Sequence, residues 1–409
     1  MSIQARLARI NKREAQLRAL VDEPDRRARL HREAAAVQDD APLRGWFLGV
    51  KDILHADGLV TRAGTSLPPD LFARDREAAC VAALRRTGCL VIGKTVTTEF
   101  AMFAPGRTAN PHDTAHTPGG SSSGSAAAVA DGMVPLALGT QTAGSIIRPA
   151  SFCGVVGYKP TFDSICPTGL KNAAWTLDTV GVFARDVADA ALFAGVLDGR
   201  RCRADAFDAS RPPRLGLCRT PQWAAADADT RAAMAEAERQ AVAAGATVRP
   251  IDLPAAFDAL LAAQHTIMAY ELARTLAFEY DTAASQISDR LRAILDEGQM
   301  IDGAAYDAAR RVADECRSGL DAVFANAGVD VLIAPSAPGE APLRRQGTGD
   351  PVFNRIWTLL GVPCINVPGL TGATGLPVGV QVVGKCNDDA TALAAARWLA
   401  TSIQAPTRD

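Results

Sequence analysis

Apolar and polar positions along the chain alternate between helical and strand-like periods, which predicts an α/β fold. Apolar residues at helical spacing, with charges between them, predict a first helix over residues 2–38. The same spacing predicts further helices over residues 76–88, 125–131, 186–197 and 227–245, and through most of 257–325. Short apolar runs predict buried strands at residues 46–50, 89–92, 134–138, 214–218, 329–334, 362–367 and 378–383.

The order of these elements predicts a single large three-layer α/β/α domain, with a central mixed β-sheet covered by helices on both faces. Within residues 1–409 we expect an N-terminal helical arm over 1–40, a catalytic core over 43–200, a variable substrate-side helical region over 257–350, and C-terminal core strands and a helix over 351–409. Connections rich in Pro, Arg, Gly or Asp are expected near 200–212 and 338–351. We interpret the arm as a helix packed on its own chain, with a dimer-forming arm, and hence a homodimer, as the alternative.

Composition narrows the class of protein. Hydrophobic residues make up 48% of the 409 residues, which is ample for a large core, and the net charge of -2 argues against a nucleic-acid binder. No apolar run reaches the roughly 18 residues that a membrane span needs, and the charged N-terminus lacks the apolar centre of a signal peptide. The nine cysteines include no CxxC pair, which favours reduced thiols over disulfides or a zinc site, and a cytoplasmic protein.

The stretch over residues 118–161 holds the densest candidate chemistry. Two loops rich in Gly, Ser and Thr, over 119–124 and 139–145, flank a small-residue helix and a strand, and we expect them to converge on one site. A glycine-rich loop before a helix can bind phosphate, but the GK[ST] ending of such phosphate-binding loops is missing here. The GxSxG motif of the nucleophile elbow is also absent around Ser145. A simpler role, capping the helix and satisfying loop amides, is expected for some of Ser121, Ser122, Ser123 and Ser125.

A serine nucleophile in this stretch needs a base. None of the five histidines has a strong context for a Ser/His/Asp triad, and His112 and His116 lie closest in the sequence. A lysine can serve instead if burial and nearby positive charge lower its pKa from about 10.4 towards neutrality. Lys51 is the candidate, because it ends an apolar strand and should point into the interior.

The stretch over 118–161 resembles the signature of the amidase signature family, whose usual pattern is GGSSGGS, then GTDTGGSIR, then P-A-x-F-C-G-x-x-G-x-K-P-T. The likeness extends to the GVKD around Lys51 and to D-V-L-I-A-P at residues 330–335. Shorter matches are GKT at 93–95, EF at 99–100, NP at 110–111, LDTVG at 177–181, and GVP and GLPVGVQVVG near the C-terminus. Together these motifs cover most of the chain beyond residue 43.

The resemblance implies a Ser–cisSer–Lys triad that cleaves a small-molecule amide through an acyl-enzyme. Ser145 would be the nucleophile, Lys51 the base, and Ser121, after a cis Gly120–Ser121 peptide, the proton relay between them. The resemblance also implies an oxyanion hole made by backbone N–H groups, those of Thr142, Ala143, Gly144 and Ser145. It calls for no metal and no organic cofactor.

Four residues depart from the family's usual pattern. Ser123 replaces a glycine, and Gln141 and Ala143 replace the commoner Asp and Gly. Arg148 lies three residues after Ser145 instead of two, which resembles malonamidase-type members whose arginine holds the substrate's carboxylate. We therefore expect small amides that carry a carboxylate, such as malonamate-like half-amides or ureido acids. The alternative is a structural arginine paired with a buried acid.

Substrate specificity is expected to come from residues 257–310, 338–351 and 354–357, outside the signature. Small polar substrates are favoured, but a broad aryl or aliphatic amidase is an alternative, with Phe103, Phe162, Trp175 and Trp357 as candidates to line an aryl pocket. A second alternative is the glutaminase subunit of a tRNA-dependent amidotransferase, which GTQTAGSIIR fits poorly. A third, a catalytically inactive binding protein on the same fold, is disfavoured by the intact candidate triad.

Overall fold

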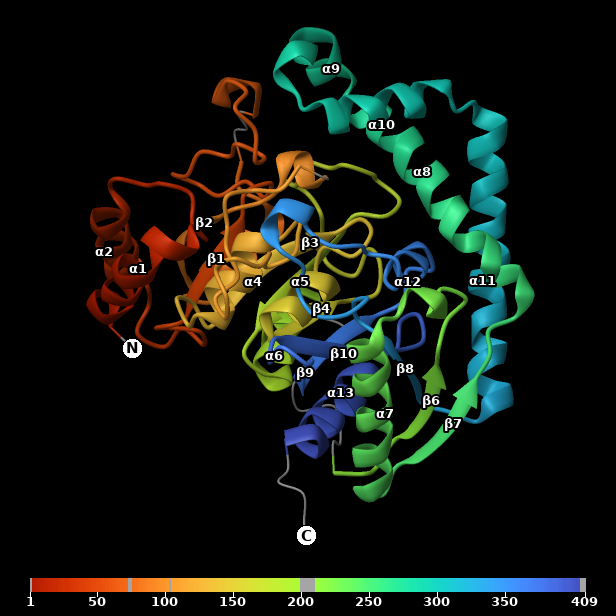
Figure 1. The fold of residues 1–409 in the computed structure, drawn as a ribbon. Helices are drawn as coiled ribbons and strands as arrows, with labels where there is room; N and C mark the ends of the chain where they lie inside the picture. The colour runs from red at the N-terminus through yellow and green to blue at the C-terminus, as the bar shows by residue number, and fades with distance from the viewer. Residues whose placement is uncertain (1, 73–75, 103, 199–209, 405–409) are drawn as a thin grey trace.

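The computed structural model describes residues 2–72, 76–102, 104–198 and 210–404, and its ten strands form one sheet. The strands are β1 (Phe47–Lys51), β2 (Leu90–Thr95), β3 (Leu136–Gln141), β4 (Val156–Lys159), β5 (Thr179–Ala184), β6 (Arg214–Cys218), β7 (Thr247–Ile251), β8 (Val331–Pro335), β9 (Cys364–Thr371) and β10 (Pro377–Val383). Their spatial order is β2-β1-β3-β5-β4-β9-β10-β8-β6-β7. Figure 1 shows β2 and β1 towards one end of the sheet and β6 and β7 at the other. Strand β1 is parallel to β2 and β3, and β6 is parallel to β7 and β8, whereas the central pairs are antiparallel. The predicted mixed sheet is confirmed.

Helices cover both faces of this sheet, because its strands are apolar on both sides. Along β3, Leu136 and Leu138 enter one apolar core and Ala137 enters the other, as the two-residue period of a strand requires. The first core also takes in α3 (Ala79–Arg86), α6 (Val187–Asp198), α7 (Ala228–Ala243) and α13 (Asp389–Gln404). The second core takes in α4 (Ser123–Ala130), α5 (Ile147–Cys153), α8 (Leu260–Thr275), α10 (Asp289–Met300), α11 (Gly303–Ala327) and α12 (Arg355–Leu359). The predicted α/β class is confirmed.

The N-terminal segment forms two helices, α1 (Ile3–Leu17) and α2 (Arg26–Ala36), so the prediction of one helix over residues 2–38 is wrong. Arg18 has a left-handed φ of 50°, and the Glu14 carboxylate accepts hydrogen bonds from the next two backbone N–H groups. The chain then runs along the edge of the sheet, where the Val21 N–H donates to the Lys94 carbonyl at 2.8 Å. After α1 the chain therefore pairs with strand β2 instead of continuing as a helix.

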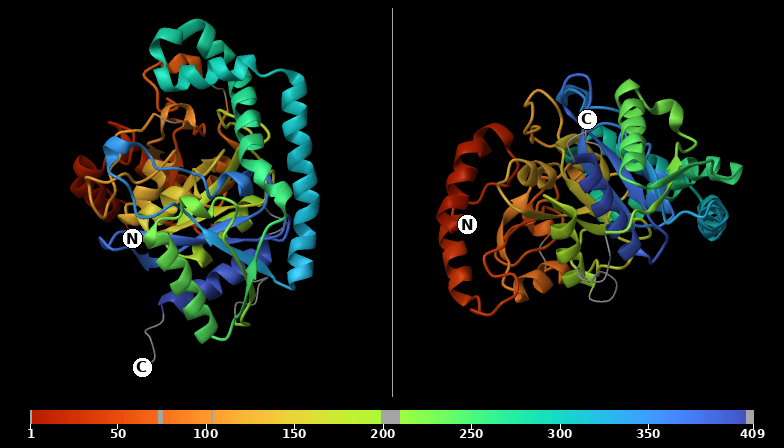
Figure 2. Two further views of the ribbon diagram at one scale, coloured as in Figure 1. Left: turned by 45° about the vertical axis from the view of Figure 1, so that its right-hand side comes forward. Right: turned by 90° about the horizontal axis from the view of Figure 1, so that it is seen from below.

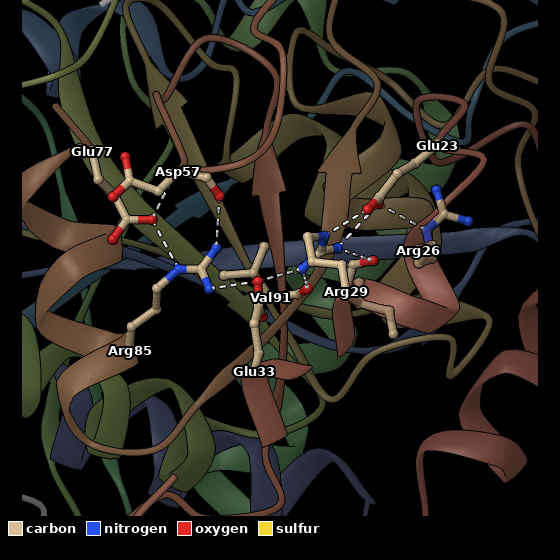
Figure 3. A network of polar contacts seen from close by, with 9 residues as sticks. Glu23, Arg26, Arg29, Glu33, Asp57, Glu77, Arg85 and Val91 are labelled. Carbon is tan, nitrogen blue, oxygen red and sulfur yellow. Dashed lines mark hydrogen bonds and ion pairs between the residues drawn. The ribbon is translucent and has the colours of Figure 1, made fainter. Parts of the chain in front are cut away.

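A charged network holds α2 against the edge strand β2 (Figure 3). The Arg29 guanidinium donates to Glu23 at 2.6 Å, to Glu33 at 2.8 Å and to the Val91 carbonyl at 2.8 Å. Arg85 of α3 joins the network through an ion pair with Glu33 at 2.9 Å. The network covers a sheet edge that would otherwise present unpaired backbone groups. In Figure 2, α1 and α2 lie on one side of the molecule and α11 lies on the other.

Strands β2 and β3 both continue past the ends that the sequence pattern predicts, towards the residues around Lys51. Strand β2 continues through Gly93–Thr95, and β3 continues to Gln141, into the predicted second loop. The register aligns Val50 of β1 with Leu138 of β3, so Lys51 and Thr140 lie close together at neighbouring strand ends. Most of the connection predicted near 200–212 lies outside the described residues.

The remaining helix, α9 (Ala277–Ala283), joins α8 to α10, and together with α11 these helices form the region that Figure 1 shows in teal and cyan. Strand β7 had no sequence signal, because it lies at the sheet edge and four of its five residues are wholly or partly exposed. Within the described residues, none of the helices combines the length and apolarity that crossing a membrane requires.

Candidate active site

Lys51 is fully buried at the end of β1, as its apolar strand predicts. Its Nζ donates to Ser121 Oγ at 2.7 Å and to Thr140 Oγ1 at 2.8 Å. Burial lowers the pKa of Lys51 to about 7, and the negative charge of Asp178 opposes part of this change. A substantial fraction of this amine is therefore unprotonated near neutral pH.

Ser121 lies in the Gly-rich loop before α4, and the Gly120–Ser121 peptide bond is cis, as the resemblance implied. The Ser121 side chain is 2% exposed. The Gly-rich loop can reach Lys51 because α4 packs directly against the backbone of Ala19 and Val96. A Cβ added at Gly124 would lie 2.2 Å from the Ala19 carbonyl oxygen and 2.3 Å from the Val96 nitrogen, so only glycine fits.

The neighbouring serines brace the strands and do not cap the helix. Ser122, at the N-cap of α4, makes no side-chain cap hydrogen bond. Ser123 Oγ donates to the Val96 carbonyl at 3.2 Å, and Ser125 Oγ donates to the Leu138 carbonyl at 2.9 Å. The expectation that these hydroxyls cap the helix is wrong, whereas the expectation that they satisfy loop amides is confirmed by Ser122 Oγ, which accepts from the Thr140 N–H at 3.4 Å.

Ser145 lies between β3 and α5 and is 7% exposed. Ser145 and Ser121 line the same cavity, whose volume is about 50 Å³. The other described residues that line it are Ala101, Met102, Thr142, Ala143, Arg148, Met268, Thr348, Gly349 and Pro351. Met268 comes from α8, and residues 348–351 come from the connection before α12, so regions outside the signature complete the cavity.

The loop that carries Ser145 is held by side chains that the sequence pattern did not single out. Asp178, within the LDTVG motif, accepts from Thr142 Oγ1 at 2.5 Å, and burial raises the pKa of this carboxyl to about 6. Gln264 of α8 donates to the Thr142 carbonyl at 3.2 Å. Thr358 of α12 donates to the Ala143 carbonyl at 2.7 Å. Of these, only Asp178 had a local signal, its motif.

Arg148 is 5% exposed, and it lies in the cavity wall. Its Nη2 donates to the Gly120 carbonyl at 2.6 Å, while its Nε and Nη1 are buried without a hydrogen-bond partner. Burial lowers the pKa of Arg148 to about 10, and the charge of the exposed Asp350 acts in the opposite direction. Within the described part of the chain, no ion pair joins Arg148 to a carboxylate, so the alternative of pairing with a buried acid finds no support.

The remaining candidates lie away from this cavity. His112 Nε2 contacts the Cys153 carbonyl at 2.9 Å, and His116 pairs with Asp113 at 3.0 Å. Trp357 is fully buried in the second core, and Trp175 is 43% exposed. Neither these residues nor Phe162 belong to the described cavity lining, so an aryl pocket built from them finds no support, while Phe103 lies outside the described residues.

Comparison with known proteins places this chain in a family. A family model described as "Amidase" matches residues 2–393. The A subunit of the glutamyl-tRNA(Gln) amidotransferase of Anaeromyxobacter sp. (strain K) is 33% identical over an alignment of 459 residues, covering 97% of this chain and 91% of that protein. Among solved structures, one described as an amidase superimposes with a TM-score of 0.87 at 29% identity, covering 97% of this chain and 94% of the other. The native peptide amidase from Stenotrophomonas maltophilia gives a TM-score of 0.81 at 30% identity, covering 97% and 92%. The chain therefore belongs to the amidase signature family and is a hydrolase that acts on amide C–N bonds.

Proposed function

We propose that this protein is a serine amidohydrolase in which Ser145 is the nucleophile, Ser121 the proton relay and Lys51 the base. One observation carries the proposal. The Lys51 amine, fully buried and with a pKa of about 7, lies 2.7 Å from Ser121 Oγ, and Ser121 and Ser145 both line the cavity. A buried amine that is readily deprotonated can accept a proton from a hydroxyl, which an exposed lysine does poorly.

In the proposed first step, neutral Lys51 takes the proton of Ser121 as Ser121 takes the proton of Ser145. Ser145 Oγ then attacks the amide carbonyl, and a C–O bond forms. The protons return along the same relay to the leaving nitrogen as the C–N bond breaks, which leaves an acyl group on Ser145. Water, deprotonated by the same relay, attacks that ester. The bond between the acyl carbon and Ser145 Oγ breaks, Ser145 takes back a proton from the relay, and the acid leaves.

The carbonyl oxygen becomes negatively charged in this step and needs hydrogen-bond donors. The backbone N–H groups of Thr142, Ala143, Gly144 and Ser145 are proposed to supply them, where one donor contributes about 3–4 kcal/mol to the transition state. Three of these four residues line the cavity. This chemistry uses groups of the chain and water alone.

For the substrate, we propose a short amide that carries a carboxylate held by Arg148. The Nε and Nη1 groups of Arg148 are buried without a hydrogen-bond partner and Arg148 lines the cavity, so its guanidinium has N–H donors left for a carboxylate. A cavity of about 50 Å³ holds only a few water-sized groups, which favours a short acyl chain. Malonamate-like half-amides and ureido acids meet both conditions, and this preference would make the chain malonamidase-like.

The test is ammonia release from malonamate, ureidoacetate, succinamate, propionamide and L-glutamine. We expect Ser145→Ala to abolish turnover of every substrate that the wild type cleaves. Arg148→Ala is expected to lower kcat/KM for malonamate by about 10- to 100-fold more than for neutral propionamide, because it removes charge-assisted hydrogen bonds. Since Arg148 also holds the Gly120 carbonyl, a purely structural role would lower both values equally, and that result rejects carboxylate recognition.

A glutaminase subunit of a tRNA-dependent amidotransferase is the second candidate, because the A subunit of one such enzyme is 33% identical over nearly the whole chain. In L-glutamine, three carbons separate the amide carbon from the carboxylate, whereas one separates them in malonamate. A rate that rises from malonamate to succinamate to L-glutamine, or copurification with a stable heteromeric partner, would favour this candidate. Self-association through the N-terminal arm stays a prediction.

A further inference from the structure

The peptide groups of the loop that carries Ser145 are held from outside the loop by two side chains. Gln264 Nε2 donates to the Thr142 carbonyl at 3.2 Å, and Thr358 Oγ1 donates to the Ala143 carbonyl at 2.7 Å. In a planar trans peptide the carbonyl and the following N–H point in opposite directions. Holding these two carbonyls therefore fixes the directions of the Ala143 and Gly144 N–H groups.

Both holding side chains are themselves locked in orientation. Gln264 is fully buried, and its Oε1 accepts from Arg355 Nε at 2.5 Å, so its amide cannot rotate without losing two hydrogen bonds. Thr358 Oγ1 accepts from Gln141 Nε2 at 2.9 Å, and its own proton has the Ala143 carbonyl at 2.7 Å as its nearer acceptor and the Asn354 carbonyl at 3.1 Å as its farther one. Helices α8 and α12 thus both reach the same loop.

Gln141 connects this arrangement to the two ends of the loop. Its Oε1 accepts from the Ile146 and Ile147 N–H groups at 2.8 and 3.1 Å, while its Nε2 donates to Thr358. An ionised aspartate at this position could accept but not donate, so it could not hold Thr358 in this way. Gln141 is fully buried, and its neutral amide also avoids the cost of burying a charge.

Other buried side-chain amides also donate to backbone carbonyls, but the carbonyls that they hold lie away from the cavity, unlike those held by Gln264 and Thr358. Gln381 Nε2 donates to the Pro335 carbonyl, and Asn366 Nδ2 donates to the Val155 carbonyl. Neither Pro335 nor Val155 is among the described residues that line the cavity, whereas Thr142 and Ala143 both are. Only Gln264 and Thr358, of these four side chains, hold peptides at the place where the amide would react.

We propose that Gln264 and Thr358 are positioning residues that aim the Ala143 and Gly144 N–H groups at the oxyanion. The inference rests on the proposed function, since it assumes attack by Ser145. The two residues act through backbone and do not touch the reacting atoms themselves. Because small misplacements of catalytic groups are costly, their loss lowers the rate of attack more than it lowers substrate binding.

The test measures how fast methanesulfonyl fluoride modifies Ser145, because this small reagent needs no knowledge of the natural substrate. Its sulfur bonds to Ser145 Oγ as the S–F bond breaks and fluoride leaves, and the Ser145 proton passes through Ser121 to Lys51. A sulfonyl oxygen takes the place of the oxyanion. Thr358→Val removes one donor with little change in shape, and Thr358→Ser keeps the hydroxyl. Gln264→Glu keeps the acceptor for Arg355 and removes the donor to the Thr142 carbonyl.

We expect Thr358→Val and Gln264→Glu each to slow this modification by about 10- to 100-fold, and Thr358→Ser to stay within about threefold of the wild type. On malonamate, kcat should fall in the two slow variants while KM stays within about threefold. Matched controls are Thr401→Val, which removes a hydroxyl that donates to the Arg397 carbonyl, and Gln16→Glu, which keeps an acceptor for Arg13. Both controls should react at the wild-type rate.

Wild-type modification rates in Thr358→Val and Gln264→Glu overturn the inference and leave the proposed function intact. If one of the two variants fails to fold, the other decides the outcome by the same measurement. A wild-type protein that carries no sulfonyl group on Ser145, by mass spectrometry of its peptides, overturns the proposed function and this inference with it.

Discussion

Lys51 and Lys94 are both buried on neighbouring strands of one sheet, but they differ in whether the amine contacts a carboxylate. Lys51 is fully buried and hydrogen-bonds to two hydroxyls, those of Ser121 and Thr140. Lys94, 3% exposed, pairs with the Asp52 carboxylate at 3.0 Å and also donates to Thr61 Oγ1 at 2.8 Å. The register places Lys94 beside Val50, next to Lys51 itself.

The comparison teaches that burial alone does not make a lysine a base. Burial lowers the pKa of both amines, and at Lys94 the charge of Asp52, in direct contact with the amine, opposes this change. At Lys51 the opposing charge is that of Asp178, which instead hydrogen-bonds to Thr142 and to the backbone of Ala173. Of the two, only Lys51 contacts a hydroxyl that lines the cavity, that of Ser121.

Exchanging each lysine for methionine gives the largest expected contrast. Lys51→Met should lower kcat/KM for ammonia release from malonamate by about 10²–10⁴-fold, towards the upper end because one amine serves both acylation and deacylation. Lys94→Met, assayed at a temperature where it is folded, should keep activity within about tenfold of the wild type. If Lys51→Met retains a tenth of the wild-type activity, the comparison between the two lysines is broken.

The second expected effect is on stability and concerns the Lys94 ion pair. Lys94→Met leaves the Asp52 carboxylate buried without its cation, which should lower the free energy of unfolding by about 3–5 kcal/mol in urea titrations at neutral pH. Burial raises the pKa of Asp52, so this loss should shrink as the pH falls and the carboxyl takes up a proton.

The double variant Lys94→Met/Asp52→Asn is the control for this effect, because it removes the stranded charge. It should recover part of the lost stability at neutral pH. A double variant no more stable than Lys94→Met would show that the ion pair is not the reason for the loss.

The role of Lys51 could be predicted from the sequence, whereas the ion pair of Lys94 could not. Lys51, Ser121 and Ser145 stand in local motifs, so their convergence could be predicted without coordinates. The GKT motif around Lys94 was matched too, but it was placed after a strand that in fact continues to Thr95. The pairing of Lys94 with Asp52 depends on that continuation.

Long-range contacts account for what sequence reasoning missed at the site. Thr140 was assigned to a loop, whereas β3 continues past it and brings its hydroxyl to Lys51. Gln264 lies 122 residues from the carbonyl it holds, within a helix whose pattern only predicts a buried face. No local signal marks such a residue, because its partner is set by how α8 packs on the sheet.

The smallest expected effect is a shift in the pH dependence of activity when the negative charge of Asp178, which acts on Lys51 from a distance, is removed. With the pKa of Asp178 at about 6, its carboxylate is ionised at pH 7 and holds the pKa of Lys51 higher than burial alone would.

In the wild type, kcat/KM should rise with pH through about 7 as Lys51 loses its proton. Asp178→Asn should move this rise to lower pH, by less than about one pH unit. Thr142→Val removes the hydrogen bond that lowers the pKa of Asp178 but keeps the carboxyl, so its midpoint should move down by less than in Asp178→Asn. A midpoint that stays in place or moves up in Asp178→Asn would mean that Asp178 acts through the loop and not on the amine.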